Sequence, residues 1–457
     1  MRLELKNKHV LVLGLGDTGL SALRWLSTHG ARLSAADTRE SPPGLPAVQA
    51  ELPQVPVHLG PFRRKEFEAA DIIVASPGVS LAEPQLQAAM ARSTPVVGDI
   101  ELFAQYKPDH AKVIAVTGAN GKSTVVTLIG DMCKKAGLST IVAGNIGLPV
   151  LEALAMPAPE MYVLELSSFQ LETTFSLQAD AATVLNVTED HMDRYSGMDT
   201  YAAAKAHIFC GNGVQVLNRE DLWSHGMALA GRKVVTFGTD LPPSHNDFGL
   251  LHRGGEVFLA QGDTELLNIA DMHIAGLHNA TNALAALALC RAIGLPYEPL
   301  LNALREFKGL PHRVAWVAET GGVAFYDDSK GTNVGASCAA LAGLPQKVVL
   351  IAGGDGKGQD FSPLREAVFQ NARAVVLIGR DGPQIGAALQ GLSVPLLQAE
   401  SMEHAVQLAY GAALRGDAVL LSPACASFDM FRNYIHRAEV FAAAVHNIAG
   451  QRQGAAQ

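Results

Sequence analysis

The chain has 457 residues, of which 48% are hydrophobic and 17% charged, and its formal net charge at pH 7 is -9. This length exceeds what one hydrophobic core usually supports, so we expect two or three domains. The composition excludes a disordered protein. The negative charge argues against nucleic acid as a partner, because a phosphate backbone attracts basic surfaces.

Three segments, at residues 9–19, 112–124 and 347–357, each combine a short apolar run, a glycine turn and a helix-like stretch. Continuous apolar strands that alternate with helical patterns indicate parallel sheets covered on both faces. We predict three α/β domains at residues 1–106, 107–309 and 310–457. The first and last are predicted to be Rossmann-like, and the central one a P-loop ATPase-type parallel sheet.

In the first segment, Gly14-Leu-Gly-Asp-Thr-Gly19 is followed by Asp37 near the end of a second apolar run. These residues satisfy a dinucleotide-binding pattern, in which glycines let a phosphate approach the start of a helix. The pattern alone is weak evidence. From these residues alone, NAD and another nucleotide diphosphate both remain open.

The second segment contains the sequence TGANGKST directly after an apolar run. Gly118 and Gly121 let several backbone N–H groups converge, and the helix that follows adds a partial positive charge. Lys122 brings a full charge to the outer phosphates, and Ser123 or Thr124 supplies a hydroxyl for Mg²⁺. The loop is shorter than the standard P-loop, because Val116 and not a glycine stands five residues before Gly121, yet it predicts triphosphate binding. The predicted loop residues are Thr117, Gly118, Ala119, Asn120, Gly121, Lys122, Ser123 and Thr124.

Three further residues bear on metal binding. Glu165 lies at the exit of an apolar run and offers the hard oxygen that Mg²⁺ prefers. His191 follows another apolar run and has acidic neighbours, which favours a role at the site. Lys205 lies among alanines in a helical pattern, and from the residues alone we expect it to be a solvated surface lysine.

Five cysteines, an odd number, are widely spaced and form no Cys-x-x-Cys pair. This spacing predicts reduced thiols rather than a disulfide framework or a zinc site. No run of 18 apolar residues occurs, so we expect no membrane span. Together these features predict a cytoplasmic protein, which we expect to be a monomer.

Several motifs recur in the same order in the Mur ligases, and the chain resembles that family over essentially its whole length. They are the loop at 117–124, Glu165, the Asn-x-x-x-Asp-His-x-Asp run at 186–193, and the stretches at 276–283, 310–313, 327–333 and 421–427. The match is best with the branch that adds glutamate to UDP-N-acetylmuramoyl-L-alanine in peptidoglycan synthesis. The resemblance implies a three-domain ligase that uses ATP to convert a carboxylate into an acyl phosphate, which the amine of an amino acid then attacks.

The resemblance assigns roles around the ATP. It implies that Lys122, His191 and Lys205 are catalytic and that Lys205 is carbamylated by CO₂, contrary to its interpretation as a surface residue. Ser123 and Glu165 would then hold one Mg²⁺, and His191 with the carbamylated Lys205 the other. The remaining nucleotide contacts implied by the family are Asn279, Asn282, Arg313 and Asp328.

The resemblance also implies the positions of the two substrates and favours UDP over NAD in the first domain. The residues implied for the UDP-linked substrate are Gly14, Leu15, Gly16, Asp17, Thr18, Asp37, Thr38, Arg39, Ser76, Pro77, Gly78, Asn145 and Ser167. The residues implied for glutamate are Lys330, Thr332, Lys357, Ser427, Phe428 and Tyr434.

Near the implied glutamate site the chain departs from the family. After Tyr434 the family commonly shows Glu and then Arg-Gly, whereas here Ile435, His436-Arg437 and Ala438 follow. D-Glutamate is the favoured substrate, and a ligase that adds L-glutamate to the same acceptor is the alternative. A folate-extending ligase ranks lower because it has no use for a UDP domain. An NAD-dependent oxidoreductase and a nucleotide-gated switch are the remaining alternatives.

Overall fold

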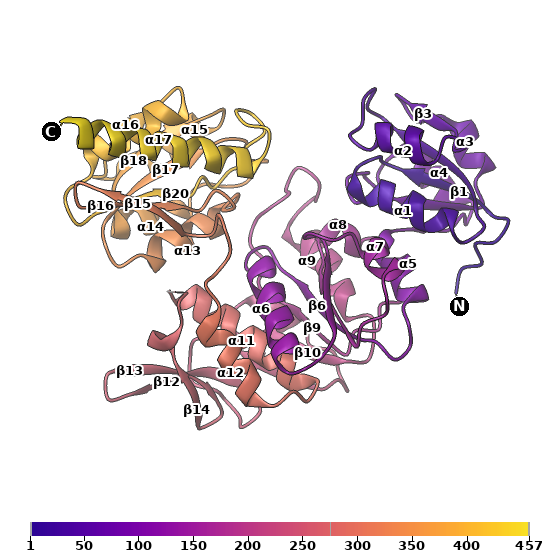
Figure 1. The fold of residues 1–457 in the computed structure, drawn as a ribbon, viewed down its shortest axis with the longest axis horizontal. Coiled ribbons are helices and arrows are strands. Elements are labelled where there is room, and N and C mark those ends of the chain that lie inside the picture. The colour runs from indigo at the N-terminus through magenta and orange to yellow at the C-terminus, as the bar shows by residue number, and fades with distance from the viewer. Residues whose placement is uncertain (1, 275, 456–457) are drawn as a thin grey trace.

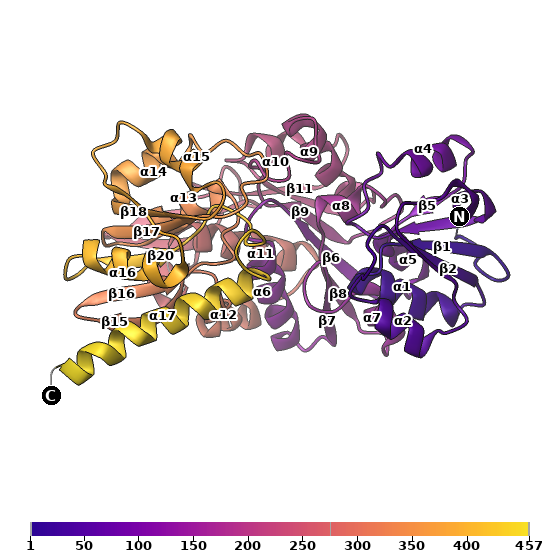
Figure 2. The same cartoon turned by 90° about the horizontal axis from the view of Figure 1, so that it is seen from above.

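The structure is a computed structural model that describes residues 2–274 and 276–455. It has three lobes that follow one another along the chain, each built on one sheet, and the middle lobe lies between the other two (Figures 1 and 2). The sheets contain five, nine and six strands. The predicted three-domain α/β fold is confirmed. The exact domain boundaries stay predictions.

The first sheet is parallel throughout, with the strand order β3-β2-β1-β4-β5. The order reverses beside β1, and in such sheets ligands bind in the crevice at that reversal. Its elements are β1 (His9–Leu13), α1 (Asp17–Ser27), β2 (Arg32–Asp37), α2 (Leu45–Glu51), β3 (Val57–Leu59), α3 (Arg64–Ala69), β4 (Ile72–Ala75), α4 (Pro84–Ala91) and β5 (Val96–Val97).

The middle sheet has the order β14-β13-β12-β11-β10-β9-β6-β8-β7. Its elements, with the linking helix α5, are α5 (Asp99–Tyr106), β6 (Lys112–Thr117), α6 (Lys122–Lys135), β7 (Thr140–Gly144), α7 (Val150–Ala155), β8 (Met161–Glu165), α8 (Ser168–Leu171), β9 (Ala181–Val184), α9 (Met198–Ala206), η1 (His207–Phe209), β10 (Val214–Asn218), α10 (Leu222–Gly226), β11 (Val234–Phe237), β12 (Phe248–Arg253), β13 (Glu256–Gln261), β14 (Thr264–Asn268), η2 (Ile269–Asp271), α11 (Leu277–Ala292) and α12 (Tyr297–Glu306).

Helices cover both faces of β6, as the continuous apolar strand predicts. Ile114 and Val116 pack with α6, α11 and α12 in one cluster, while Val113 and Ala115 pack with α5, α7 and α9 in another. The successive residues of β6 therefore face opposite cores, which leaves only the strand ends free to build a site.

The predicted parallel sheet of the middle domain is confirmed, and it extends at one edge into a hairpin meander in which β12, β13 and β14 run antiparallel. Gly254 and Gly255, with φ of 60° and 85°, form the two-residue turn between β12 and β13. Such left-handed pairs favour tight hairpins over crossovers. The Gly-Gly dipeptide was the sequence signal for this departure.

The third sheet has the order β15-β16-β20-β17-β18-β19 and is parallel except for β15 at its edge. Its elements are β15 (Ala315–Thr320), β16 (Val323–Asp327), α13 (Val334–Gly343), β17 (Val348–Gly353), α14 (Leu364–Asn371), β18 (Ala372–Ile378), α15 (Gly382–Leu389), β19 (Leu396–Gln398), α16 (Met402–Ala412), β20 (Ala418–Leu421) and α17 (Tyr434–Ala455).

Two findings bear on the wider expectations. All five cysteines are free thiols in the structure. Within residues 2–274 and 276–455, no helix combines the length and the apolar character that crossing a bilayer requires.

Candidate active site

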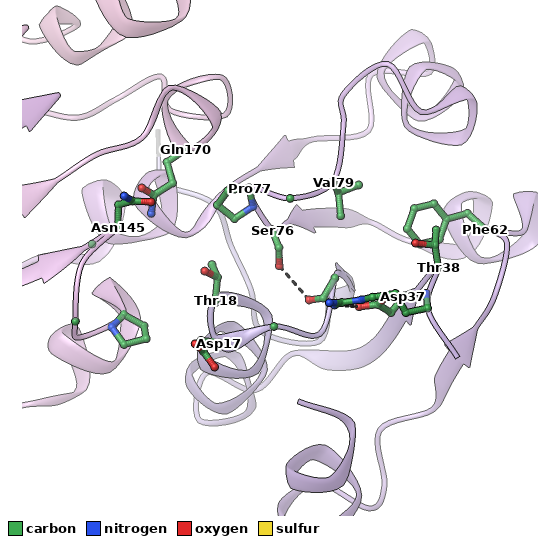
Figure 3. Close-up of a pocket in the computed structure, with 17 residues that line it drawn as sticks. Asp17, Thr18, Asp37, Thr38, Phe62, Ser76, Pro77, Val79, Asn145 and Gln170 are labelled. Atoms are coloured by element: carbon green, nitrogen blue, oxygen red, sulfur yellow. Dashed lines mark hydrogen bonds and ion pairs between the residues drawn. The ribbon is translucent and has the colours of Figure 1, made fainter. Parts of the chain in front are cut away.

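A cavity of about 640 Å³ lies at the strand-order reversal of the first sheet (Figure 3). Gly14 follows β1, Asp37 ends β2 and Ser76 follows β4, so three strand ends meet there. The hydroxyl of Ser76 donates to the carbonyl oxygen of Gly14 over 3.0 Å. The start of α1 also faces the cavity through Asp17, and a helix N-terminus favours an anionic ligand.

The glycine that ends the loop after β1 is required by packing. A Cβ at Gly19 would lie 1.8 Å from the carbonyl oxygen of Gly14, so α1 can start this close to β1 only with glycine there. Close backbone approach is the role that the last glycine of the dinucleotide pattern performs.

Asp37 is a buried carboxylate that stays ionised. Burial would raise its pKa, but hydrogen bonds from the Arg39 side chain and the Leu15 amide hold the pKa at about 2. Its other oxygen accepts from the Arg39 backbone and side chain. The pair gives the cavity a polar end with a fixed acceptor and a half-exposed cation.

Most residues predicted for the UDP-linked substrate lie together in this cavity. Those that line it are Gly14, Gly16, Asp17, Thr18, Asp37, Thr38, Arg39, Ser76, Pro77, Gly78 and Asn145. Leu15 and Ser167 do not line it: Leu15 is fully buried and contributes its amide to Asp37, and Ser167 caps α8. Lining residues that the sequence reasoning missed are Phe62, Val79, Gly144, Gly147, Pro149 and Gln170.

A second cavity, of about 290 Å³, lies between the middle and third domains beside the loop at 117–124. Predicted nucleotide residues that line it are Asn120, Gly121, Thr124, Asn279, Asn282, Arg313 and Asp328. Thr117, Gly118, Ala119, Lys122 and Ser123 do not line it. The missed residues are Asn186, Thr188, His278, Thr281, Val314, Gly331, Gly335, Ala336, Ala339 and Ala340.

The loop itself has the conformation expected of a phosphate loop. Gly118 and Gly121 have φ of 155° and 85°, and α6 begins at Lys122. A Cβ at Gly121 would lie 2.5 Å from the Asn282 side-chain oxygen. The ammonium of Lys122 donates to the carbonyl oxygens of Gly118 at 2.8 Å and Ala119 at 2.9 Å, so the loop holds its own cation. Burial lowers the pKa of Lys122.

The residues predicted to hold Mg²⁺ are Ser123 in α6, Glu165 in β8, His191 in the loop between β9 and α9, and Lys205 in α9. Glu165 ends β8 and is buried; one carboxylate oxygen accepts from Asn145 at 2.9 Å, while the other has no hydrogen-bond partner. A buried carboxylate oxygen without a donor fits a hard cation such as Mg²⁺. Burial also lowers the pKa of His191 to about 4, which keeps the imidazole neutral and able to ligate.

The prediction that Lys205 is a solvated surface residue is wrong. Its side chain is 1% exposed, and its ammonium nitrogen donates to the Gly118 carbonyl oxygen at 3.0 Å. The same nitrogen lies 4.4 Å from the centroid of the Tyr201 ring. Burial lowers the pKa of Lys205 well below its ordinary value. Ala202 and Ala204 beside it are also buried, so Lys205 lies on the packed face of α9, which the small size of the alanines concealed.

No group of three or more His, Cys, Asp or Glu side chains among the described residues is arranged to bind a metal. The predicted ligand set is therefore not a conventional one. It relies on the hydroxyl of Ser123, which accepts from Arg313 at 3.1 Å, and on Lys205. As an amine next to a carbonyl oxygen, Lys205 supplies no oxygen ligand; only its carbamate would.

The six residues predicted for glutamate lie on loops after β16, β17 and β20 and at the start of α17. The ammonium of Lys330 lies 4.0 Å from the centroid of the Tyr434 ring, and burial lowers its pKa to about 8. Ser427 is buried and Phe428 is 74% exposed. Lys357 instead forms an ion pair with Asp190, and none of the six lines either cavity described above, although Gly331 lines the second.

Direct contacts join the third domain to the middle one. Lys357 and Asp190 lie 2.5 Å apart, and the side-chain amides of Asn120 and Asn333 exchange two hydrogen bonds at 3.1 and 3.0 Å. The Asp360 amide donates to Glu189 at 3.0 Å. Strands of both domains thus direct their loops at one place.

Several residues at this junction have left-handed backbone conformations without being glycine. They are His191, His312, Val314, Lys357 and Ala424, with φ between 49° and 62°. For a β-branched residue such as Val314 this conformation is strained, and strain of this kind clusters at functional sites. The junction is therefore where we expect the chemistry to take place.

Comparison with known proteins agrees with this geometry. Residues 8–98, 116–290 and 312–425 match models described as the Mur ligase MurD-like N-terminal domain, the Mur ligase middle domain and the Mur ligase glutamate ligase domain. The UDP-N-acetylmuramoylalanine–D-glutamate ligase of Methylobacillus flagellatus is 64% identical over 98% of each chain. The chain belongs to the Mur ligase family.

A further Mur ligase, the UDP-N-acetylmuramoylalanine–D-glutamate ligase of Chromobacterium violaceum, is 52% identical over 96% of this chain and 97% of its own. The crystal structure of the UDP-N-acetylmuramate–alanine ligase MurC of Thermotoga maritima covers 96% of this chain and 100% of its own, with a TM-score of 0.61 and 20% identity. At that identity the likeness shows the fold alone. The predicted family and its ligase chemistry are confirmed, and the roles of individual residues stay predictions.

Proposed function

We propose that the chain joins D-glutamate to UDP-N-acetylmuramoyl-L-alanine at the expense of ATP, in peptidoglycan synthesis. The observation that carries the proposal is the pairing of two sites across the middle domain. A large polar cavity lies at the strand-order reversal of the first sheet, and a phosphate loop lies beside a smaller cavity at the third domain. Close relatives over the full length carry the name of this activity.

The residues on the chain suit the first chemical step. The carboxylate of the UDP-linked substrate and the γ-phosphate of ATP are both negative, so they need cations between them. Lys122 on the loop and Arg313, which reaches it from the third domain, supply that charge without a proton transfer. Because Arg313 arrives with the third domain, domain closure completes the site.

Mg²⁺ would be held by residues that the fold places around the loop. The unpartnered oxygen of Glu165 and the hydroxyl of Ser123 would hold one ion, and neutral His191 with a carbamate on Lys205 the other. The ions supply charge neutralisation for the transferring phosphoryl group. Asn145 donates to the remaining oxygen of Glu165 and so orients the carboxylate.

The carbamate on Lys205 is part of the proposal. In this reaction the neutral amine of Lys205 adds to the carbon of CO₂ and loses a proton, so a buried amine becomes an anionic carbamate that can ligate a metal. The burial of Lys205 beside a carbonyl oxygen, with no carboxylate hydrogen-bonded to it, supports the reaction. With ¹³CO₂ we expect a carbamate carbon resonance in the wild-type protein and none in Lys205→Ala. A short-chain carboxylate that restores part of the activity lost in Lys205→Ala would support the carbamate. Wild-type rates in Lys205→Ala without such a carboxylate would contradict the carbamate.

The decisive experiment is phosphate release from ATP with each substrate omitted in turn. We expect release only when UDP-N-acetylmuramoyl-L-alanine and D-glutamate are both present, because the acyl phosphate needs the first and its turnover needs the second. Release with ATP alone would favour a nucleotide-gated switch. Turnover with L-glutamate and none with D-glutamate would contradict the proposed stereochemistry.

A further inference from the structure

A chain of hydrogen bonds runs from the linking helix α5 to the wall of the large cavity. Asp99, the first residue of α5, is 3% exposed, and one of its oxygens accepts from the side-chain amide of Gln170 at 3.1 Å. Its other oxygen is buried and has no hydrogen-bond partner. No cation pairs with it in the described chain. A buried carboxylate held in this way is costly, so its retention needs a reason.

The hydrogen-bond partner of this carboxylate, Gln170, belongs to the cavity wall. It lines the cavity next to Asn145 (Figure 3), although its side chain is 2% exposed. Its amide oxygen accepts from the backbone and the hydroxyl of Ser167 at 3.1 and 3.3 Å, while its amide nitrogen donates to Asp99. Turning the amide over would set its NH₂ group against the Ser167 donors and its oxygen against a carboxylate. The orientation of the amide is therefore unique.

An amide nitrogen carries two N–H groups, and Asp99 uses one of them. We propose that Asp99 is a positioning residue that orients Gln170 so that its second N–H donates to an oxygen acceptor of the UDP-linked substrate. The inference rests on the proposed function and deepens it. It makes α5, which joins the first sheet to the middle one, part of substrate recognition.

A purely structural role for Asp99 is the competing explanation, and α5 provides the control for it. Glu101, two residues further along α5, accepts from the amides of Phe175 and Ser176 at 2.7 and 2.9 Å and from the Ser176 hydroxyl at 2.6 Å. Glu101 thus anchors the same helix to the same domain without touching the cavity wall. A variant of Glu101 therefore tests the anchoring of α5 separately from the orientation of the Gln170 amide, which a variant of Asp99 tests.

The test compares Asp99→Ala, Gln170→Ala, the double variant and Glu101→Gln. Affinity for UDP-N-acetylmuramoyl-L-alanine is measured by calorimetry without ATP, and KM and kcat for all three substrates by phosphate release. We expect each single variant at Asp99 or Gln170 to bind the UDP substrate about tenfold more weakly, as loss of one hydrogen bond to a ligand predicts. The double variant should be no weaker than Gln170→Ala, because both act through one contact.

The KM values for ATP and glutamate should stay within about twofold, and Glu101→Gln should bind the UDP substrate like wild type. Wild-type affinity of Asp99→Ala, additive losses in the double variant, or an equal rise of all three KM values would each overturn the inference. If Asp99→Ala does not fold, Asp99→Asn decides, since its amide oxygen can still accept from Gln170. Near-wild-type affinity of Asp99→Asn beside a weak Gln170→Ala supports the inference, and a weak Asp99→Asn overturns it. Failure of wild type to bind the UDP substrate would instead refute the proposed function.

Discussion

Lys122 illustrates how a single side chain is prepared for its ligand. Its ammonium donates to two carbonyl oxygens of its own loop, so the charge is kept in place before a phosphate arrives. Burial lowers its pKa, while Glu165 and Asp190 raise it and so favour the charged form. A triphosphate would replace the carbonyl oxygens with stronger acceptors.

We predict that Lys122→Ala lowers the rate of phosphate release by roughly 10²–10³, the usual cost of one stabilising group at a transition state. Affinity for the UDP-linked substrate should stay unchanged, since the large cavity lies elsewhere. Lys134, exposed on the last turn of the same helix, is the control, and Lys134→Ala should keep the wild-type rate. An active Lys122→Ala would refute the assignment of the loop.

The burial of Asp99 should make the free energy of unfolding depend on pH. Burial raises its pKa from 3.8 to about 6, so between those values the folded chain holds a proton that the unfolded chain has lost. The free energy of unfolding therefore falls as pH rises from about 4 to 6 and then levels off. Asp99→Asn removes this contribution, so its stability relative to wild type should rise across the window by roughly 3 kcal/mol. Urea unfolding of both proteins at pH 4 to 7 measures this difference in the free energy of unfolding. If the free energies of the two proteins changed with pH in parallel, the prediction would be contradicted.

At the scale of one element, α1 depends on the turn that precedes it. The helix starts so close to β1 that any Cβ at Gly19 collides with the Gly14 carbonyl oxygen, whereas a Cβ at Gly16 meets nothing within 4 Å. Gly16 also has φ of -91°, which other residues adopt freely. Packing against the backbone therefore requires glycine at position 19 but does not require it at position 16.

We predict that Gly19→Ala destabilises the first domain by at least 2 kcal/mol, since backbone atoms must move to admit the methyl group. Gly16→Ala should leave its stability within about 0.5 kcal/mol. Thermal unfolding of the two variants compares them directly. Equal stability would mean that the turn after β1 is not as tight as the structure has it.

At the scale of the whole molecule, the closed junction of the middle and third domains rests on few polar contacts. One of them joins Lys357, which is predicted to bind glutamate, to Asp190. This ion pair engages an ammonium that the predicted glutamate site would need, and it is one of the polar contacts that join the two domains.

We predict that Lys357→Ala opens the ligand-free molecule, which small-angle scattering would record as a larger radius of gyration. Arg373 is the control, because it pairs with Asp417 within the third domain and Arg373→Ala removes no contact between domains. Identical scattering of Lys357→Ala and wild type would show that the ion pair does not hold the junction closed.

The sequence by itself determined the three α/β modules, the phosphate loop and most of the large cavity. These features depend on local patterns: apolar strands, glycine turns and helix starts, which act over a few residues. Asp37 and the glycines at 14, 16 and 121 line the cavities as the motifs predicted, because each lies at the end of a strand or in the loop that follows it, and strand ends converge at one edge of a parallel sheet. The family resemblance extended this to residues of the third domain.

Only the tertiary structure decided which charges are buried and what they touch. The local sequence predicts a surface position for Lys205, which is buried only because α9 packs against the loop. Asp99 and Gln170, which form a hydrogen bond, are 71 residues apart in the chain. Lys357 and Asp190, 167 residues apart, meet only when two domains close. Burial and pairing arise from contacts between distant segments, and no local pattern encodes them, so the chemistry of these groups follows from the fold and not from the motif.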